Sequence, residues 1–377
     1  MSRIDELIAK LCPNGVEYKK IDNVALRLKG SPITATEMKN IVVANGPVRI
    51  FAGGRTYVDT DYKFCKNFNI NNVPSVIVKS RGIIDVEFYD KPFTFKQEMW
   101  AYIGKDQVIT KFLFYILTTK LTYLRNIGSK MGSMPQIKLE DTEKLSIPVP
   151  PLEIQREIVN VLDTFTKLEA ELEAELEARR RQYHYYRDQL LNFEGRDDVQ
   201  WMTLGEVATI GTGSRNTNEA IPEGKYPFFV RSQQPLLIDE FEFDEISIIT
   251  AGDGVGVGKV FHFVNGKYAL HQRAYRIHIT SNHLNPKFIF YFIRNDFARY
   301  LATTSVHASV TSLRKPMFEK YPIPVPPLEE QARIVAILDK FDVLVNDLSS
   351  GLPAEIAARR KQYAYYRDRL LTFKEAQ

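Results

Sequence analysis

The sequence predicts a mixed α/β (α+β) protein in which two α/β domains are joined by long helices packed as an antiparallel coiled coil, with an internal two-fold pseudo-repeat. Three observations predict this fold. Two sequence blocks occur twice in the same order, each pair follows a segment of β-branched runs and glycine-containing turns, and each pair carries a long helical pattern. A chain of 377 residues also exceeds what one hydrophobic core usually serves.

The composition is that of a folded protein without a membrane-spanning or secretory segment. Hydrophobic residues make up 44% and charged residues 25%, which excludes the disordered class. No window approaches the apolar length that a bilayer requires, and the start MSRIDELIAKLCPNG lacks a signal-peptide pattern. Cys12 and Cys65 lie far apart without a CxxC pairing, which favours reduced thiols. We therefore expect a cytoplasmic protein without a membrane partner, and the net charge of +4 leaves other partners open.

The internal repeat consists of two blocks. IPVPPLEIQREIVNVLDTF (147–165) returns as IPVPPLEEQARIVAILDKF (323–341), at an offset of 176 residues (323 − 147). RRRQYHYYRDQLLNF (179–193) returns as RRKQYAYYRDRLLTF (359–373), at an offset of 180 residues (359 − 179), so the second copy is longer between its blocks. Upstream, KFLFYILTT is echoed by KFIFYFIRN, and between these landmarks the halves diverge. This pattern indicates two related domains with different targets, and an old duplication whose loops drifted is the alternative.

The divergent segments carry strand patterns. PSVIVKS (74–80) and EISIITA (245–251) are β-branched runs that end at glycine-containing turns. GKVFHFVNGKYAL (258–270) contains Asn265-Gly266, a dipeptide typical of tight hairpins, and is expected to form two short strands around it. Each divergent segment is therefore expected to be a compact α/β domain.

The repeated blocks carry helix patterns. Pro151 and Pro327 occupy positions typical of a first helical turn, and no proline or glycine follows from 152 to 193, which predicts one long helix. In the second copy Gly351 and Pro353 predict a break. Four parts follow from these patterns: a first domain (1–148), a central helical spacer (149–198), a second domain (199–324) and a C-terminal helical region (325–377).

No motif in the sequence supports catalysis or metal binding. AGDGVGVGKV (251–260) has Asp and Val where a phosphate-binding loop needs Gly and Ser or Thr, so a turn between strands is favoured, with a close approach to a DNA backbone as its functional interpretation. NPKF (285–288) resembles part of an amino-methyltransferase motif but lacks its second proline, which favours a helix start. The clustered histidines His262, His271, His278 and His283 lack metal-site spacing. We expect neither catalytic nor metal-ligating residues, and a non-enzymatic binding role.

The doubled blocks PVPPLE.Q...V..LD.F and RR.QY.YYRD.LL resemble those of the specificity subunits of type I restriction-modification enzymes, over essentially the whole chain. CPNGVEYKK and KGSPITATEMKN are also similar to that family, whereas IDNVALRLKG departs from its usual Leu-Gly-Glu-Val start. The resemblance implies a non-catalytic subunit with two target recognition domains, each reading one half of a split double-stranded DNA sequence. It also implies two methyltransferase (modification) subunits and restriction/translocase subunits as partners, with S-adenosylmethionine, ATP and Mg²⁺ bound by those partners and no cofactor in this chain.

Residue chemistry suggests which side chains contact DNA, because Arg reads guanine, Asn and Gln read adenine, and Lys and Arg bind phosphates. The candidates for DNA contacts are Lys29, Arg49, Arg55, Lys79, Arg81, Arg215, Asn216, Arg231, Gln233, Lys259, His271 and Arg273. Arg81 and Arg231 stand out because each follows a predicted strand. The repeated helices are expected to bind the partner subunits, and the candidates there are Leu152, Gln155, Tyr183, Tyr186, Leu328, Gln331, Tyr363 and Tyr366.

Two alternatives remain open at this stage. The chain could be a non-enzymatic scaffold in which a coiled coil joins two protein-binding domains. The repeat LEAELEAELEARRR (168–181) could be a solvated helix of incidental length, or a spacer whose length sets the gap between two DNA half-sites. Glu175 and Glu177 precede Arg179 and Arg181 by four residues, which favours ion pairs along this helix.

Overall fold

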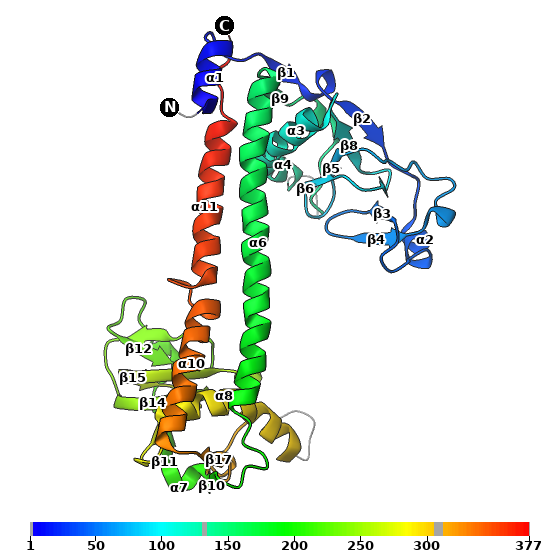
Figure 1. The fold of residues 1–377 in the computed structure, drawn as a ribbon. Helices are drawn as coiled ribbons and strands as arrows, with labels where there is room; N and C mark the ends of the chain where they lie inside the picture. The colour runs from blue at the N-terminus through cyan, green and yellow to red at the C-terminus, as the bar shows by residue number, and fades with distance from the viewer. Residues whose placement is uncertain (1–2, 130–133, 305–311, 377) are drawn as a thin grey trace. The chain divides into compact units, whose positions relative to one another are not determined.

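The computed structural model describes residues 3–129, 134–304 and 312–376. The chain divides into two compact units, unit 1 (Met1–Leu172 and Ile356–Gln377) and unit 2 (Glu173–Glu355). The ribbon in Figure 1 shows that each unit contains one α/β domain and a pair of helical segments. The predicted division into four parts at 148, 198 and 324 stays a prediction. The two units divide the chain at other positions, one of which lies inside helix α6 (Leu152–Leu190).

Unit 1 contains a four-stranded sheet of order β2-β8-β5-β6 and a three-stranded sheet of order β4-β3-β7. Helix α3 packs on β5 and β6, where Phe112 and Ile116 join Val76 and Val78 in one core. The elements of this part are α1 (Arg3–Leu11), β1 (Tyr18–Lys20), η1 (Ile21–Asn23), β2 (Leu26–Lys29), α2 (Ala35–Asn40), β3 (Val48–Phe51), β4 (Tyr57–Thr60), η2 (Tyr62–Phe64), β5 (Ser75–Lys79), β6 (Asp85–Tyr89), β7 (Phe93–Phe95), β8 (Trp100–Ile103), α3 (Gln107–Thr119), α4 (Leu121–Gly128), α5 (Leu139–Glu143) and β9 (Ser146–Pro148).

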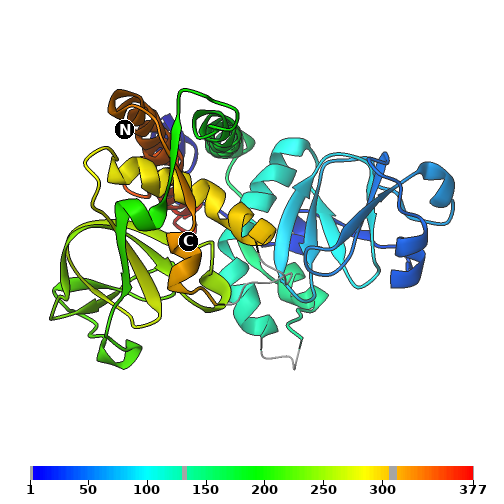
Figure 2. The ribbon, with the colours of Figure 1, turned by 90° about the horizontal axis from the view of Figure 1, so that it is seen from below.

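Unit 2 contains a six-stranded sheet of order β11-β16-β14-β15-β12-β13. Helix α8 lies on β14 and β15, as Figure 2 shows for the yellow helix beside the lime strands, and Phe288 of α8 shares a core with Ile248 and Ile277. The elements of this part are β10 (Gln200–Thr203), α7 (Leu204–Val207), β11 (Ala208–Thr212), η3 (Thr217–Glu219), β12 (Tyr226–Phe229), β13 (Leu236–Ile238), β14 (Phe243–Ala251), η4 (Gly254–Gly256), β15 (Phe261–Leu270), β16 (Ala274–Ile279), α8 (Pro286–Thr304), α9 (Lys315–Glu319) and β17 (Pro322–Val325).

The two domains share one topology, which confirms the predicted pseudo-repeat. The order β2-β8-β5-β6 in unit 1 matches β11-β16-β14-β15 in unit 2. Each domain also has one parallel pair, β3 with β7 and β12 with β15. In each, a short antiparallel pair joins the start of the domain to the strand before the Pro-Pro turn, β1 with β9 and β10 with β17. The divergent segments are therefore two versions of the same scaffold.

The long helices pair within each unit and run antiparallel where they meet. In unit 1, Phe165 of α6 stacks on Tyr366 of α11 (Leu352–Leu370), with ring centroids 5.6 Å apart, and Glu169 binds Arg360 at 2.6 Å. Higher residue numbers on α6 therefore face lower residue numbers on α11, so the two helices run antiparallel. In unit 2, Phe341 of α10 (Leu328–Asn346) stacks on Tyr186 of α6 at 5.8 Å. The repeat makes this contact twice, since Phe341 corresponds to Phe165 and Tyr366 to Tyr186.

Several predictions about individual elements are confirmed and two need correction. The predicted break is confirmed, because α10 ends at Asn346 and α11 begins at Leu352, and the extra residues of the second copy lie between them. The predicted hairpin at Asn265-Gly266 is wrong: β15 runs through it and pairs with β14, and Gly266 takes φ 120° inside the strand. Helix α10 begins one residue later than expected, with Pro327 as its N-cap. In the parts of the chain that the structure describes, none of the helices combines the length and the apolar composition that a membrane span requires.

Candidate nucleic-acid interface

Two of the first domain's candidate residues lie on adjoining turns. Arg55 is exposed on the turn between β3 and β4, and the neighbouring Gly54 N–H donates to the carbonyl of Arg81 at 2.9 Å. Arg81 is exposed just after β5, and its Nε donates to the amide oxygen of Gln136 at 3.0 Å. A Cβ on Gly53 would lie 3.4 Å from the Arg81 carbonyl oxygen, an ordinary contact distance, so the two turns are close neighbours. The structure thus brings Arg55 and Arg81 to one edge of the domain.

The other first-domain candidates differ in side-chain exposure and in whether they form ion pairs. Lys29 is exposed at the end of β2, where it pairs across the ladder with Trp100. Arg49 donates to both carboxylate oxygens of Asp59, at 2.7 and 3.0 Å, and lies over the ring of Tyr57. The hydrogen bond to Asp59 raises the pKa of Arg49. Lys79 is buried and bound to Glu87, which disagrees with its expected role as a surface contact.

In the second domain, one carboxylate accepts hydrogen bonds from two candidate arginines. Arg231 Nη1 donates to Asp253 Oδ1 at 2.7 Å, and Arg273 Nη1 donates to Asp253 Oδ2 at 3.4 Å. Both arginine side chains are largely exposed, at 43% and 60%, whereas Asp253 is 24% exposed. The structure therefore joins two residues from separate loops into one cationic edge.

The neighbouring candidates border the loop between β15 and β16. Arg215 pairs with Glu219 at 3.0 Å and Glu240 at 2.6 Å, and these hydrogen bonds raise its pKa. The exposed Asn216 accepts from Gln272, at 2.5 Å. His271 is buried and its Nδ1 accepts from the Arg273 N–H, so it orders the loop and presents no free ring surface, contrary to its expected role. Burial lowers the pKa of His271, and the nearby arginines lower it further.

The glycine-rich segment is a turn between β14 and β15, as the sequence predicts. Lys259 is exposed on it, and Gln233 is exposed on the loop after β12. In the turn between β14 and β15, Val255 is 97% exposed and follows Gly254, whose φ is 78°. A single exposed apolar side chain is ordinary on a protein surface, so Val255 by itself does not mark a contact site.

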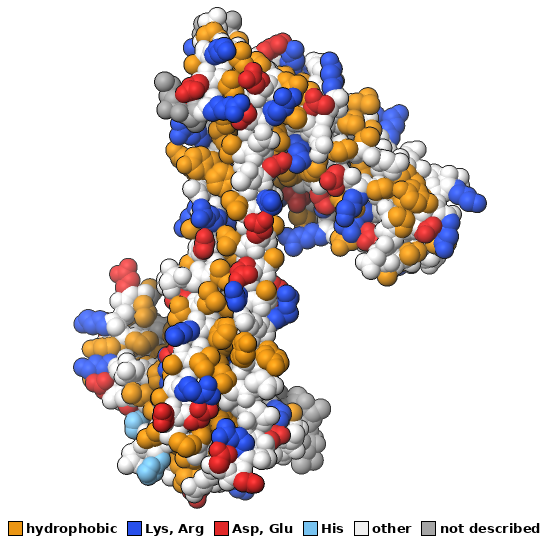
Figure 3. All heavy atoms as spheres, viewed as in Figure 1, with side chains coloured by type: hydrophobic (Ala, Val, Ile, Leu, Met, Phe, Trp, Pro, Cys, Tyr) orange, Lys and Arg blue, Asp and Glu red, His pale blue; other side chains and the backbone are white. Residues whose placement is uncertain are grey.

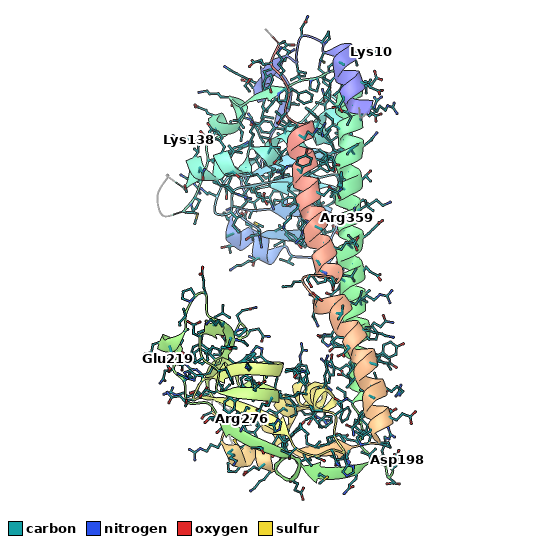
Figure 4. All side chains as sticks on the ribbon, turned by 90° about the vertical axis from the view of Figure 1, so that its left-hand side faces the viewer. Lys10, Lys138, Asp198, Glu219, Arg276 and Arg359 are labelled. Atoms are coloured by element: carbon teal, nitrogen blue, oxygen red, sulfur yellow. The ribbon has the colours of Figure 1, made fainter. Side chains whose placement is uncertain are left out.

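A charged network on the sheet of unit 2 was not predicted. Arg276 donates to Glu245 at 2.8 Å, and Tyr268 donates to the same carboxylate at 2.9 Å. Figure 4 shows Arg276 within the sheet and Glu219 at the rim of the unit. The network lies inside the scaffold, and the sequence offered no signal for it, because its members come from three strands. Among the described residues, no group of three or more potential metal ligands comes together.

The predicted partner contacts on the helices fall into two groups. Leu152 and Leu328, which are equivalent in the repeat, are 38% and 48% exposed, and Tyr186 is 42% exposed. Tyr363 and Tyr366 are half-buried against Phe165.

The second group is buried. Gln155 and Gln331 donate to the carbonyls of Pro150 and Pro326, and Tyr183 packs on Phe341, so these three side chains act within the fold, contrary to their expected role. Two exposed tyrosines were missed, Tyr185 at 63% and Tyr365 at 61%. Their equivalence in the repeat was the available signal.

Comparison with known proteins identifies the family. The sequence model described as "Type I restriction modification DNA specificity domain" matches residues 13–178 and again 196–358, once for each half of the chain. The chain belongs to the type I restriction-modification DNA specificity family. Members of this family are specificity subunits and are not the catalytic subunits of their complexes. The scaffold alternative is not favoured.

Relatives and solved structures agree with this assignment. The chain is 33% identical over 317 residues to the type I restriction enzyme EcoR124I/EcoR124II specificity subunit of Escherichia coli, covering 77% of each chain. The solved S subunit of a type I restriction-modification system from M. genitalium superposes with a TM-score of 0.65 at 18% identity, over 95% of this chain and 96% of that one. A chain from a type I system solved to explain complex assembly gives 0.57 at 17% identity, over 95% and 98%. These likenesses show that the specificity-family fold is shared.

Proposed function

We propose that this specificity subunit directs a type I restriction-modification complex to a bipartite double-stranded DNA sequence, with each domain reading one half-site. One observation carries the proposal: the same sheet topology occurs twice, while the loops at its edges carry different side chains. Two copies of one scaffold with unlike edges suit two unlike half-sites. Figure 3 shows charges of both signs interspersed over the visible face, so the DNA contacts are expected to be local clusters such as Arg231 and Arg273.

The helices are proposed to bind two copies of one methyltransferase subunit. Equivalent apolar side chains are exposed in both halves, Leu152 with Leu328 and Tyr185 with Tyr365. Exposed aliphatic and aromatic side chains of this kind serve as anchors in protein interfaces. Restriction/translocase subunits complete the proposed complex, and S-adenosylmethionine, ATP and Mg²⁺ belong to the partners in this proposal.

Helix α6 is proposed to be the spacer of the bipartite site. It is a single helix of 39 residues that contains the LEAE repeat. The predicted ion pairs along it are present, Glu175 with Arg179 at 2.7 Å and Glu177 with Arg181 at 3.7 Å. A stiff helix of fixed length transmits a change in length to the domains that it joins.

The experiment is a tagged pull-down from the source cells, followed by mapping of N6-methyladenine in the genome. The proposal expects a methyltransferase in the eluate and one asymmetric bipartite motif that disappears when the gene is deleted. A motif that persists in the deletion strain, or the absence of any methyltransferase partner, contradicts it.

A further inference from the structure

The loop edge of the second domain holds its charged residues in a fixed arrangement. Asp253 accepts one hydrogen bond on each carboxylate oxygen, from Arg231 at 2.7 Å and from Arg273 at 3.4 Å. Asp253 is the most covered of the three side chains. Each arginine commits Nη1 to the acid, and the rest of its planar donor fork remains for another acceptor.

The backbone around Asp253 is anchored from two sides. The Gly252 N–H donates to the Arg273 carbonyl at 2.9 Å, and the Leu313 N–H donates to the Gly252 carbonyl at 2.7 Å. A side chain on Gly252 would lie 2.6 Å from the Arg273 carbonyl, so the two loops touch at their backbones. Asp253 and Ser312 form an antiparallel bridge. The backbone of the acid is therefore held by the scaffold, and its carboxylate contacts both arginines.

An acidic side chain at an edge that binds DNA requires an explanation, because it repels phosphates. Exposed ion pairs contribute little to stability, so stabilising the loop is a weak reason for the acid to be there. Ordering two arginines for base contacts is a stronger one, because a bidentate contact to a base edge requires the planar donor fork in a fixed orientation.

The first domain places a different side chain at the same point of the scaffold. Arg81 lies two residues beyond β5, as Asp253 lies two residues beyond β14, and β5 and β14 occupy equivalent sheet positions. Both form antiparallel bridges to the segment just before a five-residue helix. Arg81 bridges to Gln136 before α5, and Asp253 bridges to Ser312 before α9. Both are followed by a glycine with positive φ, 71° at Gly82 and 78° at Gly254. The backbone is kept and the charge is reversed, as expected where two domains select different bases.

We propose that Asp253 is a positioning residue that presents Arg231 and Arg273 as the base-reading pair of the second domain, with guanine as the base selected. Arg in a bidentate contact with guanine O6 and N7 is the commonest specific contact in the major groove. This inference rests on the proposed function, because it presupposes that the second domain reads one half-site.

The test replaces the gene by variants of the full-length protein and maps methylated adenines in the genome. Arg231→Lys and Arg273→Lys keep the charge but remove the planar fork, and Asp253→Asn releases the arginines. We expect each variant to lose roughly tenfold or more of the preference for guanine at one position of one half-site. The other half-site should stay unchanged, which shows that the protein folds and assembles. Arg299→Lys on α8, which pairs with Asp296 and Glu194, is the matched control and should keep the wild-type motif.

Three outcomes overturn the inference. The first is an unchanged motif in all three variants. The second is a uniform loss of methylation with both half-site preferences intact, because that result marks phosphate contacts. The third is a wild-type half-site without guanine for the second domain. If the wild-type strain shows no bipartite motif at all, the proposed function itself fails, which distinguishes the two results.

Discussion

The side-chain oxygen of Gln331 accepts a hydrogen bond from the backbone N–H of Asn285, at 2.7 Å, and so ties the start of α10 to the start of α8. Gln331 also donates to the carbonyls of His283 at 2.9 Å and Pro326 at 2.7 Å. Its repeat equivalent, Gln155, donates to Pro150 at 2.7 Å, and its buried oxygen has no partner within the described part of the chain. Within the described residues, the side-chain amide of Gln331 thus has hydrogen-bond partners for both its oxygen and its nitrogen, whereas that of Gln155 has a partner for its nitrogen only.

This difference predicts unequal costs for one substitution. Gln331→Met leaves three backbone groups without their side-chain partner, one of them in a buried and two in part-buried hydrogen bonds, and should lower the free energy of unfolding by about 2–3 kcal/mol. Gln155→Met removes one hydrogen bond and also an unpaired oxygen, and should cost about 1 kcal/mol or less. Urea denaturation of both purified variants measures the difference. Equal losses would show that the neighbouring backbone groups find other partners.

Lys29 provides a prediction for phosphate binding. Its exposed position at the end of β2 suits a phosphate contact, so Lys29→Ala should weaken binding of the assembled complex to all DNA sequences alike. The dependence of log K on log salt concentration should also fall by about one charge equivalent. Lys10→Ala on α1, which removes the same charge from an exposed helix position, is the control and should leave the slope unchanged. A change of base preference in Lys29→Ala would instead assign Lys29 to base reading.

The spacer role of α6 predicts a change of gap without a change of half-sites. Duplicating Leu168–Glu171 adds about 6 Å of helix, against about 3.4 Å per base-pair step. A matching four-residue insertion between α10 and α11 keeps the paired helices in register. The gap in the methylation motif should grow by one or two base pairs, and the length-preserving Ala170→Gln should leave it unchanged. An unaltered gap in the longer protein would remove the spacer role.

The repeated framework was predictable because its signals are local. The long helix was expected over 152–193 and spans Leu152–Leu190, and the break at Gly351 was placed correctly, since proline and glycine act on their own stretch of backbone. The hairpin at Asn265-Gly266 was wrong, because pairing along β14 outweighed the local preference of the dipeptide.

The loop edges were less predictable, because neighbouring strands determine which side chains are free. Lys79 and His271 have the chemistry of DNA contacts, yet both are buried by segments remote in sequence. Asp253 was not a candidate at all, because an acid has no evident use beside DNA until Arg231 and Arg273 are seen on its two oxygens. Scanning for basic residues alone misses such positioning groups.

The central claim, that each domain reads its own half-site, is tested most directly by exchanging one domain. Residues Val199–Lys320 of this chain are replaced by the corresponding segment of a relative with a known and different motif, and the methylated motif is mapped in cells. The account predicts that one half-site becomes that of the relative while the other half-site remains as before. A motif in which both halves change, or neither does, would contradict it.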